Sequence, residues 1–157
     1  MSGTDTTPSG APLPAALTEL RDDFLALAPQ DRLQLLLELS RELPDLPERL
    51  ADHPELLEPV PECQSPIFLA VEVEGTGQDA GVEMFFSAPP EAPTTRGFAS
   101  ILDQGLAGLT AGEVTAVPSD VTSSFGLAEV VSPLRLHGMA GMLARVQRQV
   151  REKARLA

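Results

Sequence analysis

The chain has a single cysteine, few basic residues and no long apolar run. One cysteine excludes an intramolecular disulfide framework, as expected for a reducing compartment. No apolar stretch approaches the roughly 18 residues that a membrane-spanning helix requires. Residues 1–14 lack the basic and apolar regions of a signal peptide. We therefore expect a cytoplasmic protein in which residues 1–14 form a disordered tail.

Hydrophobic residues make up 43% of the 157 residues, enough for the core of one domain. The formal charge of −12 is unevenly distributed. Residues 1–131 carry 22 acidic and five basic side chains, whereas residues 132–157 carry one acidic and six basic ones. An acidic body repels phosphate, which disfavours a nucleic-acid-binding protein. The basic end could still bind nucleic acid or an anionic membrane. We favour a terminal helix whose cations face acids elsewhere on the body.

Apolar spacing predicts two helices at the start of the fold, one on the stripe from Leu13 to Leu27 and one from Pro29 to Pro44. The segment 44–66 contains six prolines and many acids, so we expect a long connection with at most one short helical turn near residues 47–52. Connections of this length inside a domain are usually functional.

Alternation from Ile67 to Val73 predicts a strand, and residues 82–87 form its hairpin partner. Apolar residues from Phe98 to Leu109 predict a helix, short turns follow to residue 126, and a long helix carries the stripe from Leu136 to Val150. The expected fold is α+β: residues 15–157 form a single domain with a small antiparallel sheet packed against flanking N- and C-terminal helices. Three glycines in the middle helix suggest close packing against a neighbour; they are Gly97, Gly105 and Gly108.

Cys63 lies in the segment Pro61-Glu62-Cys63-Gln64-Ser65-Pro66, directly before the first predicted strand. A lone cysteine is by default a small buried hydrophobe. Here polar and proline neighbours indicate the tip of a loop, where reactive thiols are found. Taken alone, these residues leave both alternatives open, and an inert thiol is the more common of the two.

Three segments in order resemble the SufE family of sulfur acceptor proteins. The first is Glu62-Cys63-Gln64-Ser65, which matches the family's Gly-Cys-Gln-Ser loop before a strand. The second is residues 92–102, where Arg96 and Gly97 open the helix after the hairpin. The third is residues 132–139, where Arg135 and Gly138 enter the last helix. The chain departs from the family pattern at Glu62, which replaces glycine, and at His137, which replaces Asn or Gln. A carboxylate beside the thiol is expected to raise its pKa.

The resemblance implies a fold shared with NifU-type iron–sulfur scaffolds and a persulfide acceptor at Cys63. It implies a non-enzymatic carrier without cofactor, which stimulates a cysteine desulfurase of the SufS type and delivers sulfur to the SufBCD scaffold complex. Residues expected to shape the loop or the docking surface are Glu62, Gln64, Ser65, Arg96, Arg135 and His137. We expect the resting thiol to lie in an apolar pocket, because a persulfide left in solvent is readily reduced.

Other functions remain open. Arg96 and Arg135 could instead form ordinary surface ion pairs. A regulatory protein could bind the desulfurase without relaying sulfur. A small cysteine hydrolase would need a histidine beside Cys63, and only His53 and His137 are available. A metal site is disfavoured, because one cysteine and two scattered histidines lack ligand spacing and NifU-type scaffolds need three cysteines. The sequence does not distinguish a monomer from a homodimer.

Overall fold

The computed structural model describes residues 13–156, and most of the predicted tail, residues 1–14, lies outside this range. The helices and strands follow in the order α1 Ala15–Leu25, α2 Pro29–Ser40, α3 Glu48–Ala51, β1 Glu58–Pro59, β2 Phe68–Glu74, β3 Gly81–Ser87, α4 Pro93–Gly105, α5 Ala111–Thr115 and α6 Pro133–Ala154. Short 3₁₀ turns complete the chain, among them η2 at Pro61–Cys63. The predicted α+β fold is confirmed.

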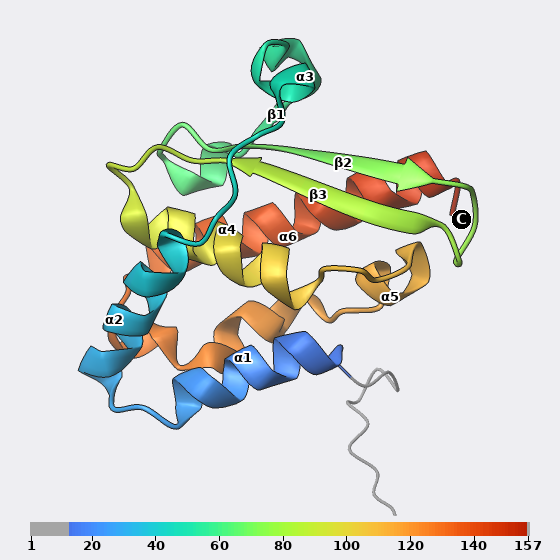
Figure 1. Ribbon diagram of the computed structural model, residues 1–157. Helices are drawn as coiled ribbons and strands as arrows, with labels where there is room; N and C mark the ends of the chain where they lie inside the picture. The colour runs from blue at the N-terminus through green and yellow to red at the C-terminus, as the bar shows by residue number, and fades with distance from the viewer. Residues whose placement is uncertain (1–12, 157) are drawn as a thin grey trace, which may run out of the picture.

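The sheet has three antiparallel strands in the order β1-β2-β3. Leu69 faces Phe86 across the hairpin, and Glu58 of β1 pairs with Leu69 on the other side. Strand β1 was missed in the sequence, because two residues ending in proline show no alternation. Helices α4 and α6 pack on one face of the sheet, and α3 lies beyond the other face (Figure 1).

Helix α4 lies between the sheet and the pair α1 and α2, so it is buried along most of its length (Figure 1). Two of the glycines singled out in the sequence permit this packing. A Cβ on Gly97 would lie 2.6 Å from the main-chain oxygen of Leu36, and one on Gly105 would lie 2.6 Å from Leu17 Cδ1. The expectation is wrong for Gly108, which has nothing within 4 Å of its Cβ position and a φ of +74°. Gly108 instead serves a turn that needs a left-handed residue.

Helix α6 begins where Pro133 occupies its first turn and the Ser132 hydroxyl accepts a hydrogen bond from the Arg135 amide. Its apolar stripe is buried from Met139 to Val150, with Met142 and Val146 between them, whereas Leu136 is partly buried. On the β1 side of the sheet, α6 also satisfies the main chain of β2. Gln149 Oε1 accepts from the Val71 amide at 3.0 Å, and Lys153 donates to the Val71 carbonyl at 2.5 Å. Helix α6 therefore continues the sheet's hydrogen bonding where β1 has ended.

Candidate functional site

Cys63 closes the 3₁₀ turn η2 in a short loop between β1 and β2. The base of the loop is fixed by a 2.9 Å hydrogen bond from the Val60 amide to the Ile67 carbonyl. Gln64 follows with a φ of 57°, in the left-handed region, and its side chain is exposed. The carbonyl of Ser65 accepts from the Ile67 amide at 2.7 Å. This backbone path turns the Cys63 side chain inward, toward α6, and not toward solvent.

Two glycines of α6 receive the loop. The Cys63 thiol donates to the Gly138 carbonyl at 3.6 Å, and a Cβ on Gly138 would lie 3.0 Å from Sγ. One turn further, a Cβ on Gly141 would lie 3.0 Å from both Cβ and Cδ of Glu62. Cys63 is consequently only 8% exposed and belongs to the hydrophobic core. Both the predicted loop and the apolar pocket expected for the resting thiol are present.

The environment of the thiol strongly disfavours the thiolate. Burial raises the pKa of Cys63 to about 12, the Glu62 carboxylate adds to the rise, and Arg145 of α6 opposes it. The predicted effect of Glu62 is therefore present, although burial is the larger cause. At neutral pH the resting thiol is protonated, and it must leave this position to act as a nucleophile.

Arg145 holds Glu62 in a two-pronged ion pair. Its Nη2 donates to both carboxylate oxygens of Glu62 at 3.0 Å, and its Nε donates at 3.2 Å. The remaining nitrogen, Nη1, donates to Glu58 of β1 at 2.7 Å. Glu58 also accepts from Arg148 and from Gln149, the latter at 2.7 Å. The main-chain amide of Glu62 and the Arg145 guanidinium keep the pKa of the Glu62 carboxyl below its usual range despite burial.

These ion pairs confirm that the basic end of the chain faces acids elsewhere on the body. They also identify two site residues that the sequence analysis missed, Arg145 and Glu58. The charge reversal between residues 1–131 and 132–157 was the available signal. It does not tell which of six cations pairs with the loop, because that depends on tertiary packing.

The predicted residues on α6 lie along the same side of the helix as the loop. Leu134 and Arg135 precede Gly138 by four and three residues, a spacing that puts them on one helical face. Arg135 and His137 are exposed, and Leu134 is 55% exposed, which is unusual for so large an apolar side chain. His137 lies close enough to Glu62 to help lower the pKa of its carboxyl. An exposed surface containing an apolar and a basic side chain thus adjoins Cys63.

The other predicted residues lie in different surroundings. Arg96 donates to the main-chain carbonyls of Ser40, Leu43 and Ala88 at 2.7–3.2 Å, and none of its bonds reaches the Cys63 loop. His53 pairs with Glu55. Within residues 13–156, no hydrogen bond joins either histidine to Cys63. The same residues contain no group of three or more side chains placed to hold a metal ion and no helix long and apolar enough to cross a bilayer.

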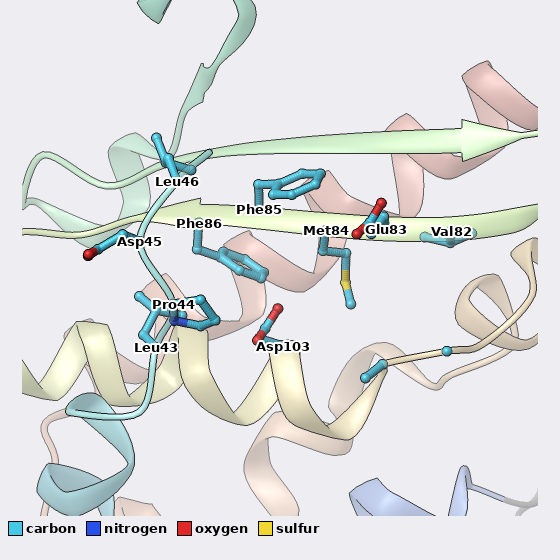
Figure 2. Close-up of a pocket in the computed structure, with 12 residues that line it drawn as sticks. Leu43, Pro44, Asp45, Leu46, Val82, Glu83, Met84, Phe85, Phe86 and Asp103 are labelled. Atoms are coloured by element: carbon cyan, nitrogen blue, oxygen red, sulfur yellow. The ribbon is translucent and has the colours of Figure 1, made fainter. Parts of the chain in front are cut away.

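A separate cavity of about 510 Å³ lies between β3, the end of α4 and residues 43–46 (Figure 2). Phe86, Met84 and Pro44 form apolar walls, and Asp103 reaches into it from α4. Burial raises the pKa of the Asp103 carboxyl. None of the predicted site residues lines this cavity.

The protein is thus a small α+β domain whose one cysteine lies in a loop directly before its β-hairpin. The chain belongs to the SufE family: residues 18–150 match the family model described as "SufE: Fe-S metabolism associated domain". It is 53% identical over 142 residues to an uncharacterized SufE-like protein of Mycobacterium tuberculosis strain H37Rv, covering 90% of this chain and 96% of that protein. A SufE-like protein of Rhizobium etli is 29% identical over 142 residues, covering 89% and 93% of the two chains.

The fold is similar to that of a solved protein. The solution structure of a hypothetical protein from Thermus thermophilus superposes with a TM-score of 0.73 at 36% sequence identity. The match covers 90% of this chain and 98% of the other. The chain is therefore a SufE-like protein whose domain type is associated with iron–sulfur metabolism.

Proposed function

We propose that this protein is a sulfur acceptor and carrier that takes persulfide sulfur from a cysteine desulfurase of the SufS type onto Cys63. The observation that carries the proposal is the placement of the one cysteine in a loop held against α6 beside an exposed surface formed by Leu134, Arg135 and His137. Membership in the SufE family supports the choice of partner.

The transfer needs one thiol and no cofactor. The Cys63 thiolate attacks the outer sulfur of the partner's persulfide, the S–S bond of that persulfide breaks, and the partner's cysteine leaves as a thiolate. The product is a persulfide on Cys63, and the number of electrons is conserved. The protein thus acts as a carrier, not as an enzyme, and it stimulates the desulfurase by removing its product. We propose the SufBCD scaffold complex as recipient and the cytoplasm as compartment.

The proposed docking surface combines the loop with the start of α6. Glu62, Gln64 and Ser65 frame the thiol, and Arg135 and His137 are exposed next to it. Within residues 13–156 the Arg135 guanidinium donates no hydrogen bond, and only the main-chain amide of this residue is bonded, to Ser132. The guanidinium is therefore available to a partner carboxylate. Arg96 has a lesser part in this proposal, because its donors are engaged by main-chain carbonyls.

The test is sulfur loading followed by intact mass. The protein is incubated with a SufS-type desulfurase, pyridoxal phosphate and free cysteine. We expect the mass to increase by one sulfur atom, and we expect reduction to remove it. The variant Cys63→Ser should gain no sulfur and should not stimulate the desulfurase. Equal stimulation by the wild type and Cys63→Ser would instead support a regulatory protein that binds the desulfurase without relaying sulfur.

A further inference from the structure

The only ion pair that the Cys63 loop makes within residues 13–156 joins Glu62 to Arg145. Glu62 is adjacent to Cys63 in the same 3₁₀ turn, whereas Arg145 lies on α6, two turns beyond Gly138. The side chains are 28% and 26% exposed, so the pair is only partly hydrated.

The pair also fixes where the loop lies. The side chain of Glu62 rests on Gly141, as the 3.0 Å approach to its Cβ position shows, while Cys63 rests on Gly138. Arg145 is itself held from the opposite side by Glu58, at 2.7 Å. Moving the loop away from α6 would break three hydrogen bonds between Arg145 and Glu62 but only one weak thiol contact. Most of the polar resistance to opening thus comes from the ion pair.

We propose that Glu62 and Arg145 form a latch that holds Cys63 in its buried, unreactive position, and that a docking partner releases the thiol by separating the two side chains. This inference rests on the proposed function, since a sulfur carrier must both protect and present its thiol. Glu62 and Arg145 are positioning residues here, because neither touches a sulfur donor.

Arg145 has two effects on the thiol, and they have opposite signs. Its positive charge directly favours the thiolate. Its bonds to Glu62 keep the loop closed and thereby disfavour the thiolate. If the direct charge effect dominated, removing Arg145 would slow reactions of Cys63. If the latch dominates, removing Arg145 exposes the thiol and speeds those reactions. The charged or titratable groups around this position are Glu62 on the loop, Glu58 on β1, and Arg145, Arg148 and His137 on α6.

The experiment measures alkylation of the free protein by iodoacetamide between pH 7 and 10, with the wild type, Glu62→Gln, Arg145→Gln and Arg145→Lys. Arg148→Gln is the matched control: Arg148 lies one turn further along α6 and pairs with Glu58 and Glu152 but not with Glu62. We expect Glu62→Gln and Arg145→Gln to react about three- to tenfold faster, the scale of a partly buried charge-assisted pair. Their pH profiles should shift to lower pH.

Arg145→Lys keeps the charge but not the two-pronged geometry, so an intermediate rate is expected, while Arg148→Gln should stay within about twofold of the wild type. A slower or unchanged rate in Arg145→Gln would overturn the latch, as would an equal increase in Arg148→Gln. If Arg145→Gln fails to fold, as judged by its thermal transition, Arg145→Lys decides: a rate equal to the wild type overturns the proposal. No desulfurase is present in this assay. An alkylation result that contradicts the latch would therefore not contradict sulfur loading on Cys63. Likewise, a failure to load sulfur would not change the alkylation result.

Discussion

Two half-buried arginines of this protein, Arg96 and Arg145, bind different kinds of groups. Arg96 donates to three main-chain carbonyls, those of Ser40, Leu43 and Ala88. Arg145 donates to two carboxylates, Glu58 and Glu62. The partners of Arg96 belong to the end of α2 and to the chain after it and before α4. One partner of Arg145, Glu62, is adjacent to Cys63 in the chain.

The difference lies in what can replace each set of contacts. Carbonyls in the interior have no other donor at hand, so the contacts of Arg96 are a permanent part of the fold. A carboxylate on a surface loop can exchange one cation for another when a partner arrives, and a half-exposed ion pair adds little to the free energy of folding. The same side chain thus stabilises the fold at one position and controls a loop at the other.

The largest effect should come from Arg96→Ala. Three carbonyls would lose their donor, so we expect the free energy of unfolding to fall by about 3 kcal/mol or more. Urea denaturation followed by circular dichroism measures this change. Arg145→Gln should lower the same quantity by about 1 kcal/mol or less. Equal losses in the two variants would contradict the distinction between them.

Two glycine substitutions compare, in the same way, a contact that holds the fold with a contact that holds the Cys63 loop. In Gly97→Ala the new methyl group meets a main-chain oxygen of α2 at 2.6 Å, and the helices must separate. We expect a loss of about 2–3 kcal/mol with no change in Cys63 alkylation. In Gly138→Ala the methyl group meets Cys63 Sγ at 3.0 Å, and the loop can yield. The expected loss is about 1 kcal/mol, accompanied by faster alkylation; unchanged alkylation would show that the loop is not the element that moves.

A further effect concerns alkaline pH, where the loss accumulates with each pH unit. The unfolded thiol ionises near its ordinary pKa of 9.0, whereas the folded one stays protonated to about pH 12. Above pH 9 the unfolded state therefore binds fewer protons, and stability falls as the pH rises, by at most about 1.4 kcal/mol per pH unit. Below pH 8 the thiol is protonated in both states, so it does not change the free energy of unfolding with pH.

Urea titrations of the wild type and Cys63→Ser at several pH values isolate this contribution. The free energy of unfolding should fall more steeply with pH in the wild type than in Cys63→Ser, and only above pH 9. A plateau after a small loss would give the free energy needed to lift the loop, because an open loop titrates without global unfolding. Identical slopes up to pH 11 would mean that the thiol is not held in its buried position.

The sequence predicted the elements whose pattern is local. The stripes of α1, α2 and α6 and the alternation of the β2–β3 hairpin each span enough residues to show their period. It did not predict β1, which is too short to have a period. It did not predict which element would cover Cys63 either, since the carbonyl that its thiol meets, that of Gly138, lies 75 residues away. Local polar neighbours indicated the loop, and the expected apolar pocket for the thiol is present, formed by a helix distant in the sequence.

In the candidate site, too, the features with a local sequence pattern were predicted and those that depend on distant residues were not. Motif order pointed to Cys63, Glu62 and Arg135, and the adjacency of Glu62 to the thiol indicated the direction in which it shifts the thiol's pKa. Arg145 was indistinguishable from the other cations of its helix, because its pairing depends on how α6 crosses β1. Sequence patterns therefore point to the candidate thiol, whereas packing determines which residues restrain it.

The hydrogen bonds that join the main chain of Val71 to Gln149 and Lys153 affect how molecules of this protein can associate. A strand edge with free amides and carbonyls invites pairing with another chain, which is a common start of aggregation. Here two side chains of α6 already occupy the main-chain amide and carbonyl of Val71, beyond the two residues of β1. An incoming strand would have to displace both before it could add. We expect this edge of the sheet to resist self-association even at high protein concentration, where an unprotected edge would not.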